Sequence, residues 1–133
     1  MGIVIGCDVS RDWIDVQMQD REARIANDPM AIAAWVRHLP PGCRVGMEAT
    51  GTLHEDLALK LVERDHIVYV LNPRWVHQYA KGLGQRGKTD RGDAGVIARF
   101  VAAEWPHLKP YEPPSAAQRE LREILRHVAA GRG

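Results

Sequence analysis

The strongest constraint on the fold is a change in the spacing of apolar residues near position 28. Before it, residues 2–7 form an apolar run, and residues 13–18 alternate strictly between apolar and other side chains. A third short segment follows a turn, at residues 22–26. These patterns predict one strand buried on both faces and two further strands joined by tight turns. We therefore expect the chain to open with an antiparallel meander.

After position 28 the pattern alternates between helix and strand. Asp28 followed by Pro29 is typical of an N-cap and a first helical residue. Thr52 and Glu55 have the spacing of a capping box, which predicts a helix to about residue 64 with Leu53, Leu57 and Leu61 facing inward. The other predicted elements are strands at residues 43–47 and 66–71, a helix opened by Asn72-Pro73, and a helix over residues 90–103.

Three antiparallel strands followed by strands linked through helices are the order of a ribonuclease H-like fold. We expect an α/β protein with a mixed five-stranded sheet and helices on both faces. The first and fourth strands should lie side by side at the centre of that sheet. Sheets of this kind bind ligands at the carboxyl ends of their parallel strands, where the strand order switches.

Composition limits the classes of protein that need consideration. The chain has 133 residues, of which 45% are hydrophobic and 26% charged, so it can build one core without help from disulfides. It has no apolar run of the roughly 18 residues that a membrane span requires. Cys7 and Cys43 stand in apolar runs and indicate buried thiols of a cytoplasmic protein. The six histidines show no metal-ligand spacing, and we expect them at the surface without a role.

The composition changes after residue 104. Four prolines make residues 105–114 a stiff linker between a domain at residues 1–104 and a helical segment at residues 115–133. Ser115 and Gln118 should cap that last helix. Its apolar stripe consists of Leu121, Ile124, Leu125 and Val128, which have no obvious partner in this chain. We therefore expect either a truncated chain or a helix that packs on another chain, as in a homo-oligomer.

Four carboxylates are placed where a purely structural role explains them poorly. Asp8 and Glu48 each end an apolar strand, and a buried carboxylate is costly unless it is paired or binds a cation. Asp90 and Asp93 share one helical face, which continues as Ile97, Phe100 and Val101. Together they predict a magnesium site, where two ions can hold the oxygens of a phosphodiester. Each acid alone could instead accept hydrogen bonds in a turn or complement a helix dipole.

Positive charge is concentrated beside the last two of these acids. The whole chain has a formal charge of +1, but residues 73–93 hold five basic and two acidic residues. The basic ones are Arg74, Lys81, Arg86, Lys88 and Arg91, and we expect them to bind nucleic-acid phosphates. The glycines at 82, 84 and 87 match a dinucleotide-binding pattern, but no strand precedes them, so we reject that interpretation. Residues 81–88 are instead predicted to be a loose segment, with Asp90 and Asp93 too far from Asp8 to share one metal when no metal is bound.

Three motifs resemble those of a known family. They are Gly6-Cys7-Asp8-Val9-Ser10, Met47-Glu48-Ala49-Thr50-Gly51 and Lys88-Thr89-Asp90-Arg91-Gly92-Asp93-Ala94. They resemble the motifs of DEDD transposases of the Piv-like insertion-sequence family, the bridge-RNA-guided recombinases with a RuvC-like amino-terminal domain. The resemblance covers roughly residues 2–104. It implies that Asp8, Glu48, Asp90 and Asp93 bind Mg²⁺ or Mn²⁺. It also implies DNA and a guide RNA as partners, and a coiled coil and a serine-containing domain beyond the first domain.

Three functional hypotheses follow. The main one is a transposase domain for metal-dependent cleavage and exchange of DNA strands in insertion-sequence transposition. The second is a fragment of an actin-like or sugar-kinase-like phosphotransferase, because those proteins share the sheet topology and also begin with a glycine-aspartate strand. The third is a non-catalytic module that binds nucleic acid and dimerises.

Overall fold

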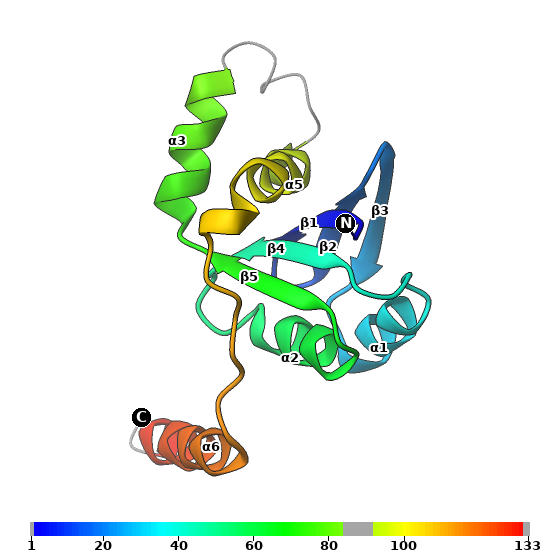
Figure 1. Ribbon diagram of the computed structural model, residues 1–133. Coiled ribbons are helices and arrows are strands. Elements are labelled where there is room, and N and C mark those ends of the chain that lie inside the picture. Colours follow the sequence, from blue (N-terminus) through cyan, green and yellow to red (C-terminus); the bar gives the residue numbers. More distant parts are fainter. Residues whose placement is uncertain (1, 84–91, 132–133) are drawn as a thin grey trace.

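The sheet has the predicted architecture. The computed structural model describes residues 2–83 and 92–131. Its five strands are β1 (Val4–Val9), β2 (Trp13–Met18), β3 (Arg21–Ala26), β4 (Arg44–Glu48) and β5 (Ile67–Leu71). They are arranged in the order β3-β2-β1-β4-β5, with β1 antiparallel to β2 and parallel to β4 (Figure 1). This mixed sheet, with the first and fourth strands adjacent at its centre, is the expected ribonuclease H-like arrangement.

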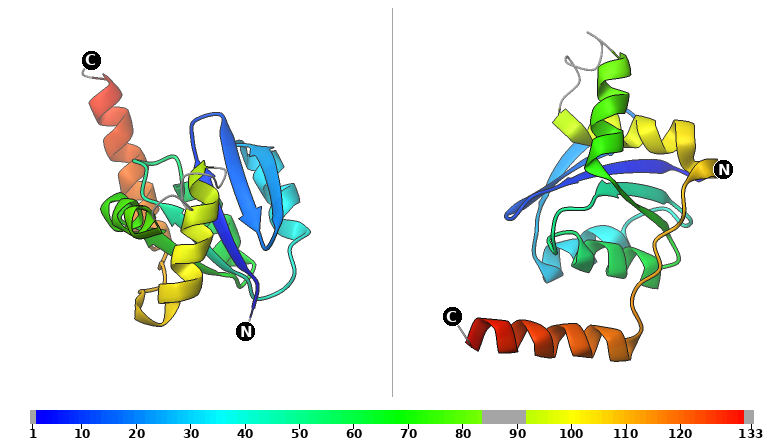
Figure 2. Two further views of the ribbon diagram at one scale, coloured as in Figure 1. Left: turned by 90° about the horizontal axis from the view of Figure 1, so that it is seen from above. Right: turned by 90° about the vertical axis from the view of Figure 1, so that its left-hand side faces the viewer.

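Helices cover both faces of the sheet, as predicted. The helices α1 (Pro29–Arg37) and α2 (Glu55–Glu63) lie on one face, and α3 (Pro73–Leu83) and α5 (Gly92–Glu104) lie on the other side (Figures 1 and 2). The 3-10 helix η1 (Trp105–His107) follows α5, and α6 (Ala116–Gly131) lies beyond α2. The α1 helix begins as its sequence predicts, because Asp28 Oδ1 accepts a hydrogen bond of 2.8 Å from the Ala31 amide.

The face under α1 and α2 forms the larger apolar core. Every second residue of the strands points to it, among them Cys7 of β1 and Met47 of β4. Ile32 of α1 and Leu61 of α2 pack against them, and all four side chains are fully buried. Cys7 and Cys43 are both buried, as predicted, and burial raises the pKa of the Cys7 thiol.

The opposite face is built for the close approach of α5. Gly6 of β1 and Gly46 of β4 are register partners and both point to this face. A Cβ atom on Gly6 would lie 2.1 Å from the carbonyl oxygen of Ala94, and one on Gly46 would lie 2.4 Å from a methyl group of Val101. The two glycines therefore let α5 rest directly on the centre of the sheet. The predicted stripe of Ile97, Phe100 and Val101 is buried there.

Two boundaries differ from those predicted. The first strand continues to Val9, so Asp8 lies within it and not just after it. The second helix begins at Glu55, because residues 51–54 form a turn that leaves Leu53 40% exposed, whereas Leu57 and Leu61 are buried as expected. No side chain caps this helix, so the proposed capping box of Thr52 is wrong.

The structure corrects two further predictions, one about the end of α3 and one about the exposure of the histidines. Lys81 belongs to α3, which continues to Leu83, so residues 81–83 are not a loose segment. Two of the histidines are not at the surface: His54 is 7% and His66 6% exposed. Each uses Nδ1 as an acceptor, for the amide of Thr50 at 3.3 Å and of Cys43 at 3.0 Å. The rest of the predicted loose segment, residues 84–88, lies outside the described residues.

The segment after α5 follows the edge of the sheet before α6 begins. The amide of Tyr111 donates a hydrogen bond of 2.7 Å to the carbonyl of Val68 in β5. Ser115 and Gln118 form the expected reciprocal capping box at the start of α6. The stripe on this helix remains exposed, from 46% at Val128 to 57% at Leu125. Among the described helices, none is both long enough and apolar enough to cross a bilayer.

Candidate metal and nucleic-acid site

Asp8 and Glu48 lie side by side at the carboxyl ends of β1 and β4. The parallel register pairs Gly6 with Gly46 and Cys7 with Met47, and the next step along the two strands reaches Asp8 and Glu48. Each acid stands two residues after its glycine and therefore points to the same face, toward α5. Both are partly buried. The sequence predicted that these two carboxylates would end adjacent central strands, and the structure brings them together at the carboxyl ends of β1 and β4.

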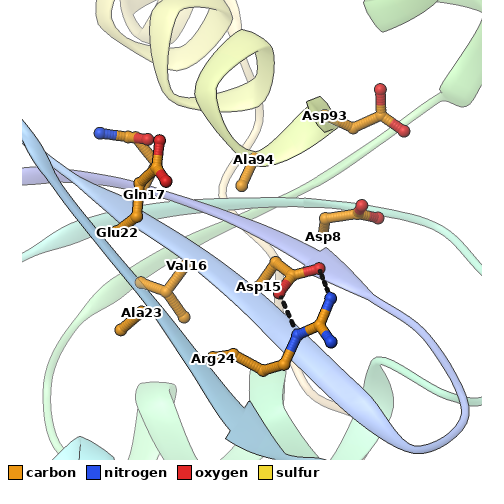
Figure 3. Close-up of a pocket in the computed structure, with 9 residues that line it drawn as sticks. All are labelled: Asp8, Asp15, Val16, Gln17, Glu22, Ala23, Arg24, Asp93 and Ala94. Atoms are coloured by element: carbon orange, nitrogen blue, oxygen red, sulfur yellow. Dashed lines mark hydrogen bonds and ion pairs between the residues drawn. The ribbon is translucent and has the colours of Figure 1, made fainter. Parts of the chain in front are cut away.

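Asp93 reaches the same place from the first turn of α5. Because α5 rests on Gly6, its amino-terminal end lies above the end of β1, and Asp93 and Asp8 face the same open space (Figure 3). Asp93 is exposed, so it does not continue the buried stripe of its helix as predicted. The fourth predicted acid, Asp90, lies outside the described residues, as do Arg86, Lys88 and Arg91.

The three carboxylates influence one another through their charges. The pKa of Asp8 is raised, first by partial burial and then by the negative charges of Asp93 and Asp15. The pKa of Glu48 is raised by partial burial and then by Asp93 and Asp8. Within the described part of the chain, neither the Asp8 nor the Glu48 side chain has a hydrogen bond or ion pair. The described part of the site therefore brings together carboxylates whose negative charges repel one another.

Two hollows meet at these acids. One of about 520 Å³ extends over β2 and β3 and is lined by Asp8, Asp93 and Arg24, among others (Figure 3). The other, of about 500 Å³, lies toward α3 and is lined by Glu48, Asp93, Arg74 and His77. The structure thus brings Arg74 to the acids, as the predicted phosphate contact requires. Lys81, almost two turns further along α3, is exposed and does not line this hollow.

Comparison with known proteins identifies the family. A family model described as a transposase, of the DEDD group of IS110 elements, matches residues 5–130. The chain belongs to this DEDD transposase family. It is 42% identical over 80 residues to the pilin gene-inverting protein of Moraxella bovis, and 32% identical over 128 residues to a probable family 20 transposase of Pseudomonas aeruginosa. The alignments cover 60% and 93% of this chain but only 24% and 35% of those proteins.

The donor set of this chain fits a hard divalent cation. Carboxylate oxygens are the ligands that Mg²⁺ and Mn²⁺ prefer in proteins, and Asp8 and Glu48 have no competing protein partner among the described residues. Within residues 2–83 and 92–131, no three His, Cys, Asp or Glu side chains are close enough to form a complete metal site. Asp8 and Glu48 thus fit the metal by the chemistry of their donor atoms, whereas Asp93 is not close enough to form a three-residue metal group with them.

The sequence did not predict Asp15 and Arg24 as neighbours of these acids. Asp15 is the register partner of Asp8 on one side and of Arg24 on the other. Arg24 donates two hydrogen bonds to the Asp15 carboxylate, at 2.7 and 3.3 Å (Figure 3). Asp15 could have been found from the alternation at residues 13–18. A tight hairpin between the first two strands places Asp15 opposite Asp8 on the same face of the sheet. The sequence also did not predict that His77 lines the hollow toward α3. It could have been found because it lies three residues after Arg74 and therefore on the same face of one helix.

Proposed function

We propose that this chain is the metal-dependent catalytic domain of a transposase that cleaves and exchanges DNA strands. The main support is the convergence of Asp8, Glu48 and Asp93 from two adjacent strands and a helix, in a chain of the DEDD transposase family. We infer that Asp90 completes the metal-binding set. The names of the relatives, which refer to gene inversion and transposition, agree with rearrangement of DNA as the activity.

The chemistry assigns a separate task to each group. A bound Mg²⁺ or Mn²⁺ would neutralise charge on the scissile phosphate. Asp8 and Glu48 would hold the metal from the rigid sheet, and Asp93 would close the site from α5. Arg74, on the α3 side of the acids, would orient the phosphate, because a guanidinium binds phosphate oxygens through two parallel hydrogen bonds.

The partners of the site are proposed from charge and from the family. DNA and a guide RNA would contact the basic residues of α3 and of the segment that follows, which are Arg74, Lys81, Arg86, Lys88 and Arg91. The exposed stripe of α6 would pair with the same stripe of a second copy, because its spacing is that of a helix–helix seam. A cytoplasmic location, with access to DNA, agrees with this role.

Metal titration tests the proposal directly. We expect calorimetry of this chain with Mn²⁺ to show binding that Asp8→Asn or Glu48→Gln weakens at least tenfold, a loss of about 1.4 kcal/mol. Asp20→Asn is the matched control, because it makes the same change in the exposed turn between β2 and β3. Absence of Mn²⁺ binding, or equal binding by Asp8→Asn and Asp20→Asn, would contradict a metal-dependent role for these acids.

A second candidate is the non-catalytic module that binds nucleic acid and dimerises. The exposed stripe of α6 favours it, since it offers an association surface independent of the acids. This candidate predicts that Asp8→Asn changes neither cation binding nor cation-dependent DNA binding. Membership of a transposase family leaves the phosphotransferase hypothesis without support.

A further inference from the structure

We propose that Arg24 of β3 binds the phosphate backbone of the nucleic-acid strand, on the side of the acids opposite to α3. This inference rests on the proposed function, because it describes the path of the strand through that site. It adds one basic contact, from the hairpin of β2 and β3, to the basic residues predicted on α3, and Arg24 is the one basic residue among the described lining of its hollow.

The register of the sheet places Arg24 close to the acids. Asp8, Asp15 and Arg24 stand opposite one another on three neighbouring strands. Since adjacent strands are about 4.8 Å apart, the Cα atoms of Asp8 and Arg24 are separated by about 10 Å. The guanidinium of Arg24 turns back toward Asp15, and thus toward Asp8 (Figure 3).

The Arg24 side chain is held in place yet keeps free donors. Asp15 accepts from Nε and from one terminal nitrogen, and the guanidinium carbon lies 5.6 Å from the centre of the Trp13 ring. A guanidinium has five N–H donors, and Asp15 uses two of them. The Arg24 side chain is 59% exposed, so the remaining donors can meet a phosphate without breaking the pair.

The shape of the surface gives the strand a continuous path. The hollow over β2 and β3 contains Arg24, the hollow toward α3 contains Arg74, and Asp93 lines both. A strand that crosses the acids from one hollow to the other would meet one arginine on each side of the scissile phosphate. Glu22 also lines the first hollow.

The experiment must distinguish two roles of Arg24: neutralising the charge of Asp15, and contacting the nucleic-acid strand. We would measure binding of a fluorescent single-stranded DNA oligonucleotide to this chain by anisotropy, in Mg²⁺, at several salt concentrations. The decisive pair is Asp15→Asn and the double variant Asp15→Asn/Arg24→Ala. In the Asp15→Asn background Arg24 no longer has the Asp15 charge to neutralise, so any further loss in the double variant comes from another role of Arg24. Arg21→Ala is the matched control, because Arg21 lies on the same strand but points to the other face.

We expect the double variant to bind about tenfold more weakly than Asp15→Asn, the loss of a charge-assisted contact to phosphate. The slope of log affinity against log salt should also fall by about 0.7, as for one lost phosphate contact on a single strand. Arg21→Ala should bind like the unmodified chain. Equal affinities for the double variant and Asp15→Asn would overturn the inference, and so would a chain that does not bind the oligonucleotide at all.

The two proposals fail in different ways. If Asp8→Asn abolishes Mn²⁺ binding but Arg24 proves irrelevant to the oligonucleotide, the metal site stands and the strand path is wrong. If no Mn²⁺ binds, yet the double variant loses affinity and salt dependence as expected, the strand contact stands and the metal-dependent function is wrong.

Discussion

The charged side chains at the two ends of the parallel strands differ in whether they have partners within the protein. At the amino end of the parallel strands, Arg44 donates a hydrogen bond of 2.6 Å to the Tyr69 hydroxyl and stacks on Trp105, with its guanidinium carbon 3.8 Å from the ring centre. At the carboxyl end, Asp8 and Glu48 have no such partner among the described residues, and their pKa values are raised. One end thus stabilises the fold, and the other keeps charged groups available for a ligand.

The same helix contributes to both ends. The first turn of α5 carries Asp93 to the acids, and its last turn leads into Trp105, which covers Arg44. Anchoring at the amino end therefore helps to hold the helix that completes the site. Rigid support of this kind is what a functional cluster needs when its own charges repel one another.

Removing the Arg44 side chain should have the largest effect on stability. Arg44→Ala deletes the contact with Trp105 and leaves the buried Tyr69 hydroxyl without its partner, so we expect a loss of about 2 kcal/mol in the free energy of unfolding. Urea denaturation measures it. Arg37→Ala, at the exposed end of α1, is the control and should stay within about 0.5 kcal/mol of the unmodified chain. Equal losses of stability for Arg44→Ala and Arg37→Ala would contradict the proposal that the Arg44 contacts stabilise this end of the sheet.

Most of the fold could be predicted because hydrophobic periodicity determines which face of a strand is buried. The apolar runs that end in Asp8 and Glu48, together with the order of strands and helices, predicted that these two acids lie on adjacent central strands. Prediction failed where the outcome depended on contacts between distant segments. Leu53 is exposed because a turn precedes α2. His54 and His66 are buried, and each accepts a hydrogen bond from the backbone amide of a residue in another segment or turn. The pair of Asp15 and Arg24 required knowledge of the strand register.

Lowering the pH should reduce the stability of the fold through His66, which lies at the amino end of the parallel strands. Its Nδ1 accepts from the Cys43 amide, and burial, followed by the charge of Arg64, lowers its pKa, although Asp65 acts in the opposite direction. The unfolded chain gains a proton near pH 6.5 while the folded chain resists it, so the stability contributed by neutral His66 is lost as pH falls below 6.5. We expect this loss to be about 1 kcal/mol, the worth of one hydrogen bond.

The matched variant for this test is His66→Asn, which keeps a side-chain acceptor near the Cys43 amide but cannot titrate. Urea denaturation between pH 7.5 and about pH 5 should show a smaller loss of stability for His66→Asn than for the unmodified chain. His54, whose pKa is also lowered by burial, remains in both proteins, and so do Asp8 and Glu48 with their raised pKa values, so these contributions cancel in the comparison. Identical pH profiles would mean that the His66 contact does not respond to protonation.

Substitution of Asp8 at the carboxyl end should give the smallest change in the free energy of unfolding, and this change should be an increase. Asp8 has Asp15 and Glu48 as neighbours on the adjacent strands and Asp93 above, so its charge destabilises the metal-free fold. Asp8→Asn removes that charge with little change in shape. We expect the free energy of unfolding without metal to rise by about 0.5 kcal/mol, a value reduced by solvent screening. With saturating Mn²⁺ the order should reverse, because bound ligand stabilises only the chain that binds it. Thermal unfolding with and without EDTA measures both states, and a stability loss in EDTA would show that Asp8 supports the fold.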